Sequence, residues 1–560
     1  MLRKIRLTLA ILFFALITLL FLDFTGSVHA LFGWMARIQF LPALLAVNVG
    51  VVLFWVLLTL LFGRVYCSVI CPLGVMQDVV AWFSKRKKKN RYSYSPAKSW
   101  LRYGVLVLFV VALIAGIGSV VALLAPYSAY GRIAQNLFAP IWACGNNILA
   151  YLAERMNSYA FYETEVWVRS LPTFIVAGAT LLILVVLAWR SGRTYCNTIC
   201  PVGTVLGLLS RVSLFRPVID LNKCNGCKLC SRRCKASCIN ADAHQIDYSR
   251  CVVCMDCIDV CRQGAISYQY RFKRSETAPA ADHETAASQA ADHADSVSAT
   301  VSTSTSASTG TTSSTCAPFV HESGAAPLSS ESNVVTCTAS GISTINPLSD
   351  TGKMRRRFLT GLGLWLGAVA VKAQEKKVDG GLAVILDKKI PERLTPIVPP
   401  GARGLHHLTA HCTGCQLCVA VCPNGVLRPS TDPMRLMQPE MSYERGYCRP
   451  ECTKCSEVCP AGAILPITPA EKSAIQIGHA VWVKANCLPV TDGVACGNCA
   501  RHCPAGAIRM VPLDPNREGS PKIPIVNEER CIGCGACEDL CPARPFSAIY
   551  VEGHKRHRMI

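Results

Sequence analysis

The sequence lacks the common motifs that hold haem or a nucleotide, although its 560 residues suffice for three or four domains. No histidine lies in its long apolar segments, which excludes a haem b held between two imidazoles inside a bilayer. There is no Cys-x-x-Cys-His sequence for covalent haem c. There is also no dinucleotide fingerprint or Walker motif for NADH or ATP. Any redox chemistry must therefore use other residues.

Acidic residues are scarce, since 36 Asp and Glu residues accompany 57 Lys and Arg residues, for a formal net charge of +21. Many of the basic residues lie beside apolar stretches, as in the segment from Lys85 to Arg91. This placement indicates membrane topology rather than nucleic-acid binding. The hydrophobic content of 51% is also high for an ordinary soluble protein. We therefore expect an integral membrane protein that contacts lipid and binds no nucleic acid.

Four apolar segments approach or reach the roughly 20 helical residues that cross a bilayer. They span residues 7–22, 40–62, 103–125 and 171–189. Basic residues precede the first segment, recur through 64–102 and follow the fourth at Arg190 and Arg193. The positive-inside rule then puts both ends of the bundle in the cytoplasm. The predicted fold for residues 1–215 is thus an α-helical membrane domain of four transmembrane helices.

Residues 275–352 are rich in Ser, Thr and Ala and are expected to form a disordered linker, in which Cys316 and Cys337 fit no ligand spacing. Residues 353–375 follow, with three arginines, an uncharged stretch and a small-residue site, and they predict a twin-arginine-like export signal or a fifth membrane anchor. The 14 residues from Phe358 to Val371 reach only about 21 Å as a helix. Cleavage and a short anchor both remain open, and both carry the following residues across the membrane.

Residues 216–272 contain two runs of the form C-x2-C-x2-C-x3-C, the spacing with which bacterial ferredoxins hold two [4Fe–4S] clusters. Three cysteines of a run bind one cluster and the fourth reaches the other cluster. The predicted sets are Cys224, Cys227, Cys230 and Cys261, and Cys251, Cys254, Cys257 and Cys234. Cys238 lies four residues after Cys234 and could replace it as the fourth ligand of the second set.

Residues 400–560 contain four further runs, each closing in Cys-Pro. They are Cys412, Cys415, Cys418 and Cys422; Cys448, Cys452, Cys455 and Cys459; Cys487, Cys496, Cys499 and Cys503; and Cys531, Cys534, Cys537 and Cys541. Structural zinc uses separated pairs of ligands, and disulfides between thiols this close would close strained loops. The six sets predict α+β ferredoxin-like domains with six [4Fe–4S] clusters, although decay of individual sites remains open.

A longer motif occurs twice in the membrane half. Residues 63–74 and 192–203 share the pattern Gly-Arg-x-Tyr-Cys-x3-Cys-Pro-x-Gly, which indicates a duplicated helical hairpin. Cysteines at i and i+4 lie on one helical face. If the two halves pack about an axis along the membrane normal, Cys67, Cys71, Cys196 and Cys200 could form one metal or cluster site, or two dithiols. They could equally be structural thiols at a helix break.

These residues carry a family resemblance. Positions 1 to about 270, with both C-x3-C-P motifs and two ferredoxin runs, resemble the NapH-type polyferredoxins, and the chain from Met354 onward resembles NapG. The resemblance to four-cluster subunits implies nested ligation, in which the first run exchanges its last cysteine with the fourth run, and the second with the third. The implied sets are Cys412, Cys415 and Cys418 with Cys541; Cys531, Cys534 and Cys537 with Cys422; Cys448, Cys452 and Cys455 with Cys503; and Cys487, Cys496 and Cys499 with Cys459.

The resemblance also implies a function. In that family the two parts are separate subunits of quinol dehydrogenases, so we expect a protein of the bacterial inner membrane that takes electrons from the quinol pool. Residues 216–272 would be cytoplasmic, and residues 400–560 periplasmic, facing a reductase or cytochrome acceptor. A loop with Tyr127, Tyr130 and Arg132 could meet a quinol headgroup, or its aromatics could be interfacial anchors. The alternatives are an assembly factor that reduces a metal or disulfide of a partner, and a passive anchor.

Overall fold

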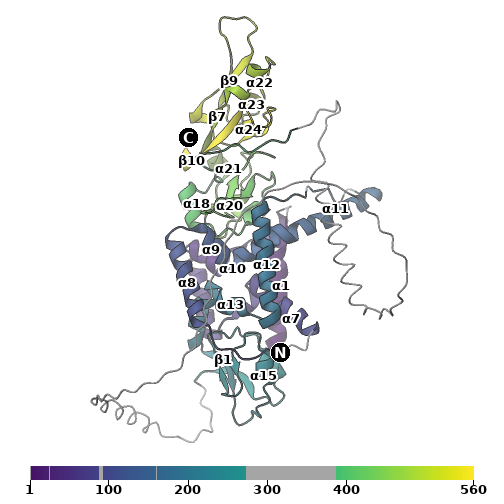
Figure 1. Ribbon diagram of the computed structural model, residues 1–560, viewed down its shortest axis with the longest axis vertical. Coiled ribbons are helices and arrows are strands. Elements are labelled where there is room, and N and C mark those ends of the chain that lie inside the picture. The colour runs from purple at the N-terminus through teal and green to yellow at the C-terminus, as the bar shows by residue number, and fades with distance from the viewer. Residues whose placement is uncertain (1, 24–25, 88–91, 159, 165, 273–385) are drawn as a thin grey trace, which may run out of the picture. The chain divides into compact units, whose positions relative to one another are not determined.

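The computed structural model describes residues 2–23, 26–87, 92–158, 160–164, 166–272 and 386–560. The predicted linker and export signal, with Cys316 and Cys337, lie outside the described residues. Residues 1–273 and 386–560 belong to one compact unit, shown in Figure 1. The other unit, residues 274–385, falls within the range that is not described.

Two helices are long and apolar enough to cross a membrane, α1 (Leu2–Leu22) and α12 (Leu171–Ser191). Each has 21 residues, so each is about 31 Å long. Only 28% and 22% of their apolar windows are buried, which leaves most of their side chains facing outward. That exposure is expected for helices that meet lipid, whereas the core helix of a soluble protein would be mostly covered.

The two middle apolar segments are each broken into two helices, a detail that the sequence did not indicate. Residues 40–62 form α4 (Phe40–Leu45) and α5 (Val49–Phe62), and the chain turns at Val47, which has a left-handed φ of 53°. Residues 103–125 fall in α8 (Ser99–Ile114) and α9 (Gly118–Leu124), with the turn at Gly116. Among the described residues the four predicted segments therefore give two long apolar helices and, in the middle segments, two shorter ones, Val49–Phe62 and Ser99–Ile114.

The sequence repeat is also a structural repeat. Helices α5, α6 (Val65–Val69) and α7 (Pro72–Lys87) correspond to α12, α13 (Thr194–Thr198) and α14 (Pro201–Leu209). Each motif begins with a glycine of positive φ, Gly63 at 74° and Gly192 at 67°. A Cβ on Gly63 would lie 2.9 Å from Val253, and one on Gly192 would lie 2.4 Å from the Lys235 carbonyl oxygen. Both glycines therefore allow close approach of the ferredoxin segment.

The remaining helices of this half lie before, between and after the two repeats. They are α2 (Ser27–Phe32), α3 (Trp34–Arg37), α10 (Pro126–Ile133), the π-helix η1 (Ala134–Phe138), α11 (Ala139–Arg155) and the 3-10 helix η2 (Ser210–Val212). Helix α10 is buried along its whole length and packs between α9, α7 and α12. It therefore forms the centre of the helical half.

The first cysteine-rich module consists of short strands and one-turn helices. Strand β1 (Phe215–Ile219) pairs antiparallel with β4 (Ile266–Tyr270), with Phe215 opposite Tyr270. The other elements are β2 (Ile239–Asn240), β3 (Gln245–Ile246), α15 (Leu229–Arg233) and α16 (Asp256–Val260). This is the α+β arrangement predicted for a ferredoxin-like domain.

The C-terminal module repeats this design with three antiparallel strand pairs. These are β5 (Leu427–Pro429) with β6 (Pro439–Met441), β7 (Ile475–Trp482) with β10 (Ile549–Met559), and β8 (Ile508–Pro512) with β9 (Lys522–Val526). Its helices are α18 (Leu405–His411), α19 (Leu417–Ala420), α20 (Lys454–Glu457), α21 (Pro469–Ala474), η3 (Lys484–Asn486), α22 (Leu488–Thr491), α23 (Asn498–Arg501), η4 (Glu528–Arg530) and α24 (Ala536–Asp539). Cysteines of the runs pack directly into its core.

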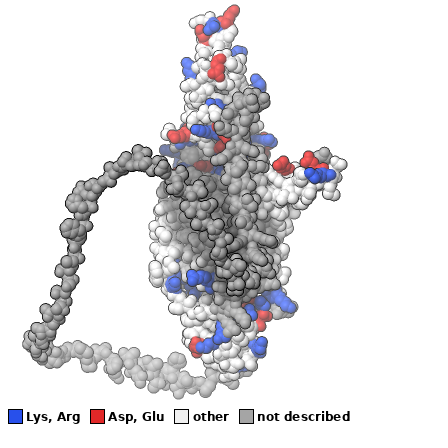
Figure 2. All heavy atoms as spheres, turned by 45° about the vertical axis from the view of Figure 1, so that its right-hand side comes forward, with Lys and Arg blue, Asp and Glu red and all other residues white. Residues whose placement is uncertain are grey.

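The two cysteine-rich modules contact opposite ends of α1. At its first turn, Arg3 forms ion pairs with Asp256 at 3.0 Å and Asp259 at 2.6 Å. At its last turn, Phe21 lines a cavity together with Ala420 of α19. On the face drawn in Figure 2, charged side chains gather above and below a band of largely uncharged surface. About 31 Å of apolar helix therefore separates the two modules.

Candidate redox centres

The first four-cysteine set, site 1, comes together as the spacing predicted. Cys224, Cys227 and Cys230 line one cavity with Cys261, the last cysteine of the second run. Lys228, between the second and third cysteines, has a positive φ of 56° and turns the chain into α15. This tight loop presents three thiols to one side, which is the donor set of a cubane cluster.

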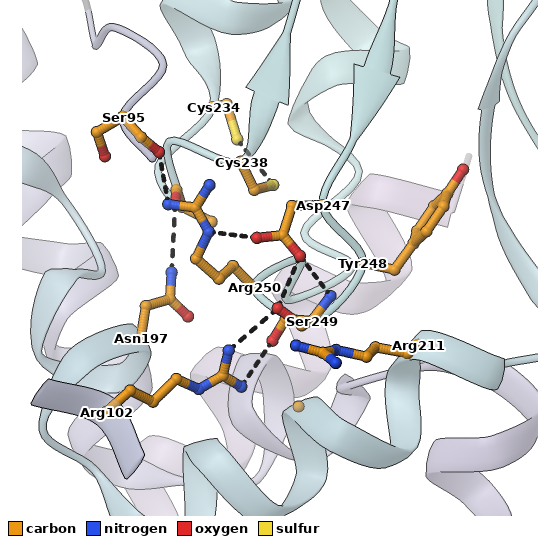
Figure 3. A network of polar contacts seen from close by, with 12 residues as sticks. Ser95, Arg102, Asn197, Arg211, Cys234, Cys238, Asp247, Tyr248, Ser249 and Arg250 are labelled. Carbon is orange, nitrogen blue, oxygen red and sulfur yellow. Dashed lines mark hydrogen bonds and ion pairs between the residues drawn. The ribbon is translucent and has the colours of Figure 1, made fainter. Parts of the chain in front are cut away.

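Site 2 contains Cys251, Cys254 and Cys257, and both candidates for its fourth ligand lie beside them. The sulfurs of Cys234 and Cys238 are 3.5 Å apart (Figure 3), and both residues are buried. The hydrogen bond from Cys238 lowers the pKa of the Cys234 thiol. Burial raises the pKa of Cys254 to about 12, so loading of the site with iron must release a proton there. Either Cys234 or Cys238 remains able to complete the set.

In the C-terminal module the nested ligation implied by the resemblance is wrong for the first two runs. Cys422, the last cysteine of the first run, lines a cavity with Cys448, Cys452 and Cys455. We call this set site 4. Cys459 in turn lies beside the first three cysteines of the first run, where its charge adds to burial in raising their pKa values. Site 3 is therefore Cys412, Cys415, Cys418 and Cys459.

The third and fourth runs exchange their last cysteines in the same way. Cys503 lies near Cys531, Cys534 and Cys537, and with them forms site 5. Cys541 is a neighbour of Cys487 and Cys499, which with Cys496 form site 6. The physical reason is local folding, since each pair of consecutive runs packs as its own two-site unit, like sites 1 and 2.

The four C-terminal sites follow one another in space. The backbone N–H of Cys448 in site 4 donates to the carbonyl of Cys534 in site 5 at 2.9 Å. Cys455 of site 4 in turn lies near Cys418 of site 3. Backbone N–H groups also reach the exchanged cysteines, as from Ile464 to Cys459 at 3.4 Å. Such N–H···S bonds are one means by which a protein sets a cluster potential.

The duplicated motif is held together by arginines that cross between the repeats. Arg64 donates to the carbonyl oxygen of Cys196 at 3.2 Å and to Asn197 at 2.9 Å. Arg193 donates to the carbonyl oxygen of Cys67. Both guanidinium groups are fully buried. Each repeat therefore fixes the first cysteine of the other, which explains why the motif carries an arginine at this position.

The four motif cysteines are all buried, and three of them, Cys67, Cys71 and Cys200, belong to one packed core. The fourth is Cys196. Gln77 donates to the Cys196 sulfur at 3.2 Å. Across the described ranges, no group of three or more His, Cys, Asp or Glu residues has the geometry to hold a single metal ion. The four motif cysteines therefore lack the geometry for one shared metal ion. This observation does not test a cluster, because the ligands of a cluster bind separate irons.

A buried charge network joins the motif to site 2. Asp78 accepts from Arg193 at 2.8 Å and from Arg6 of α1, and it lies 3.6 Å from Lys235. Lys235 also pairs with Asp256 at 3.2 Å. Burial acts to raise the pKa of Asp78, but the neighbouring cations outweigh it and hold that pKa far below its usual range. The sequence analysis missed Asp78, although a carboxylate so close to a buried cysteine motif was a usable signal.

A second network, drawn in Figure 3, orients the start of the second ferredoxin run. Arg102 donates to the Ser249 hydroxyl at 3.0 Å, and Arg250 donates to Asp247 at 2.7 Å and to the Ser95 carbonyl at 2.7 Å. Gly207 occupies the place in the second repeat that Asp78 has in the first. A Cβ at Gly207 would lie 2.0 Å from Arg102, so this departure from the repeat admits the Arg102 side chain.

The loop suggested for a quinol headgroup is not accessible. The exposed fraction is at most 1% for Tyr127, Tyr130 and Arg132. Tyr130 shares a hydrogen bond with Thr18, and Arg132 donates to the carbonyl of Ala122 at the end of α9. The interpretation of these side chains as a headgroup site or as interfacial anchors is therefore wrong, because they are buried in the core of the helical half.

The close approach inside the motif predicts an effect of small substitutions. A Cβ at Gly74 would lie 2.4 Å from the Cys67 carbonyl oxygen, and one at Gly203 would lie 2.8 Å from Arg64. We expect Gly74→Ala and Gly203→Ala each to destabilise the protein by about 1–3 kcal/mol, measured as a lower Tm in detergent. Gly178→Ala is the matched control, because its Cβ would meet nothing within 4 Å. Equal Tm values for all three variants would contradict the packing described.

Comparisons with known families identify iron–sulfur domains in both halves of the chain. A 4Fe-4S binding domain matches residues 44–91 and 173–221, and a further one matches residues 244–267. A 4Fe-4S dicluster domain matches residues 411–463 and again residues 494–544. The first dicluster match contains the first and second runs, and the second match contains the last three cysteines of the third run with the whole fourth run. The chain is therefore an iron–sulfur electron-transfer protein of the ferredoxin type.

Several curated proteins are similar to the chain. The methylamine utilization ferredoxin-type protein MauM of Methylophilus methylotrophus is 32% identical over 163 residues, which is 28% of this chain and 71% of MauM. The ferredoxin-type protein NapF of Escherichia coli K12 is 28% identical over 179 residues, 32% of this chain and 99% of NapF. The ferredoxin-type protein NapH of Haemophilus influenzae is 28% identical over 234 residues, 40% of this chain and 68% of NapH. The chain belongs to this family of ferredoxin-type proteins and is a NapH-type polyferredoxin. No solved structure matches it.

Proposed function

We propose that the chain is a multi-pass protein of the bacterial cytoplasmic membrane that oxidises quinol and passes the electrons to a periplasmic reductase or cytochrome. The observation that carries the proposal is the continuous order of sites 3, 4, 5 and 6 away from the helical half. The helical half itself contains two helices that could cross a membrane. In this proposal, all four apolar segments cross, sites 1 and 2 face the cytoplasm, and sites 3 to 6 lie outside.

The C-terminal half would then act as a NapG-type subunit fused to the membrane half. The NapH and NapF relatives carry names of redox proteins, and MauM is named for methylamine utilization. None of these names identifies the acceptor of this chain. The acceptor in this proposal is a redox protein outside the membrane that docks near site 6.

The four buried cysteines of the repeated motif are proposed to hold a seventh cluster. Two observations support this. The family model that matches both repeats is a 4Fe-4S binding domain. Cysteines 67, 71 and 200 also share one core with Cys254 of site 2 and Cys415 of site 3. Four thiolates beside the buried cations Arg64 and Arg193 make a suitable donor set, because the cations offset the negative charge of a thiolate-ligated cluster.

The same burial argues against an assembly factor that reduces a partner through these thiols. Cysteines that exchange with a partner must be accessible, and all four are at most 5% exposed. An electron carrier has no such requirement, since electrons can reach a buried cluster without contact between atoms.

The proposal is tested with the holoprotein in liposomes. With ubiquinol or menaquinol analogues in the bilayer, an impermeant dye outside should be reduced in a quinol-dependent manner, and absence of that reduction would overturn the proposal. With dithionite on the side of sites 1 and 2 and the dye on the other, the double variant Cys67→Ser/Cys196→Ser should lower transfer to background. Cys144→Ser, a cysteine outside the six sets and the motif, is the control and should transfer electrons at the wild-type rate. Unchanged transfer in the double variant would refute the seventh cluster.

A further inference from the structure

A cavity of about 140 Å³ lies beside site 3, where α1 ends and η1 and α11 begin. Its wall includes aromatic, apolar and a few polar groups, among them Asp23, Asn136, Trp142, Trp167, Arg169 and Ala420. A protein cavity of about 150 Å³ is known to accommodate benzene. The volume and the mixed lining therefore fit one six-membered ring that carries polar substituents.

The cavity is joined directly to the ligand loop of site 3. Asn136 donates to Gln416, between Cys415 and Cys418, at 2.9 Å. Arg169 donates to the carbonyl of Val419, and the next residue, Ala420, is part of the cavity wall. A ring in this cavity would thus lie next to the loop that carries Cys418, because Ala420 lines the cavity and Gln416 contacts its wall.

The surface next to the cavity is apolar. Helix α11 supplies Trp142 to the cavity and exposes Ile141 at 67% and Ile148 at 62%. Helix α12 supplies Phe174 and exposes Ile175 at 60%. An exposed apolar helix of this kind is expected at a membrane interface. A prenyl chain attached to the ring could therefore leave the cavity into lipid.

One carboxylate of the cavity wall is paired with an imidazole that does not itself line the cavity. Asp23 lines it, and backbone N–H groups of Gly26, Val28 and His29 hold its carboxylate at 2.9–3.1 Å. The His29 Nδ1 lies 3.3 Å from Asp23, and burial lowers the pKa of His29. Because a carboxylate can only accept, Nδ1 carries the proton, and the buried Nε2, which has no partner, is free to accept one. The cavity wall carries two charged residues, Asp23 of this pair and Arg169.

We propose that this cavity binds the hydroxyl-bearing ring of a benzoquinol or naphthoquinol and that the Asp23–His29 pair accepts the protons released when that quinol is oxidised; the inference rests on the proposed function. In each of two steps one quinol O–H bond breaks. The proton passes to the Asp23–His29 pair and then to solvent. A [4Fe–4S] cluster held by the cysteines of site 3 would supply the one-electron oxidant of each step and would be reoxidised by the acceptor, so that the quinol becomes quinone after both steps.

Binding is tested separately from turnover by photolabelling of the holoprotein with a short-chain azidoquinone. We expect the label in peptides containing Trp142 or Trp167, and less labelling in Trp142→Ala than in the control Trp100→Ala, whose tryptophan is 79% exposed. Benzoquinone and naphthoquinone probes form two arms of the experiment. Label confined to other peptides, with quinol oxidation intact in Trp142→Ala, would overturn the cavity as the site.

The role of the acid pair is tested in Asp23→Asn, which preserves size and keeps one of the two acceptor oxygens. A general base of this kind contributes roughly 10²–10⁴ in rate, so quinol oxidation should fall by about a hundredfold. Azidoquinone labelling and reduction of the sites by dithionite should not change, and Asp23→Glu should restore part of the rate. The control is Glu154→Gln, an exposed carboxylate on the nearby α11. Wild-type rates in Asp23→Asn would overturn the proton role, whereas a wild-type protein that oxidises no quinol would overturn the proposed function itself, before any variant is compared.

Discussion

Replacing Cys459 with serine is expected to empty site 3 and to abolish electron transfer from quinol to an outside acceptor. Cys459 belongs by sequence to the second run, yet it lies beside the first three cysteines of the first run. Cys415 of site 3 lies in the core of the helical half, so site 3 is the first C-terminal site on the proposed route. We expect quinol-dependent dye reduction at background level and a loss of about four iron atoms per chain. Cys316→Ser, at a cysteine that fits no ligand spacing, is the matched control.

Double variants distinguish the observed ligation from the nested one by iron content alone. If runs one and two exchange cysteines, Cys422→Ser/Cys448→Ser removes one cluster, because both residues belong to site 4. Cys422→Ser/Cys531→Ser then removes two, from sites 4 and 5. Nested ligation predicts the reverse, two clusters lost in the first variant and one in the second. Iron analysis and the integrated EPR signal of the reduced protein give the count, and the reverse order would contradict the sites described.

The cysteine runs could be predicted from the sequence because their spacing fixes their local shape. In several runs the residue before the third cysteine's helical turn has a positive φ, as in Lys228, Met255 and Gln416. This turn lets three thiols point to one side, and it depends only on neighbouring residues. The fourth ligand depends on how one run folds against another. That is a long-range property, and here a family resemblance gave the wrong partners.

The helical half shows the same division between local and long-range information. Its repeat and its apolar segments could be read directly, whereas the breaks at Val47 and Gly116 lie inside uninterrupted apolar sequence. The burial of Tyr130 could not be predicted either, because an aromatic loop residue has the same sequence pattern whether it packs inward or faces lipid. The cavity beside site 3 joins segments more than 250 residues apart, so no local pattern indicates it.

Replacing Asp78 with asparagine should produce the largest loss of stability. The variant would leave Arg193, which is fully buried, together with Arg6 and Lys235, without their shared carboxylate. Breaking a buried ion pair by removal of one partner costs about 3–5 kcal/mol. We expect a Tm lowered by on the order of 10 °C in detergent at pH 7. Asp259→Asn is the control, since its pair with Arg3 is largely exposed and such pairs contribute at most about 1 kcal/mol.

The pH dependence of this stability follows from the depressed pKa of Asp78. The folded pKa is lower than the unfolded one, so the contribution of Asp78 is fully present above the unfolded value of roughly 3.9 and is lost only as the pH falls from there toward the folded value. The difference in Tm between wild type and Asp78→Asn should therefore stay constant from pH 8 to about pH 5. The combined variant Asp78→Leu/Arg193→Met should recover part of the loss, because it removes both charges at once. A Tm for Asp78→Asn as close to wild type as that of Asp259→Asn would show that the buried carboxylate does not hold the repeats and site 2 together.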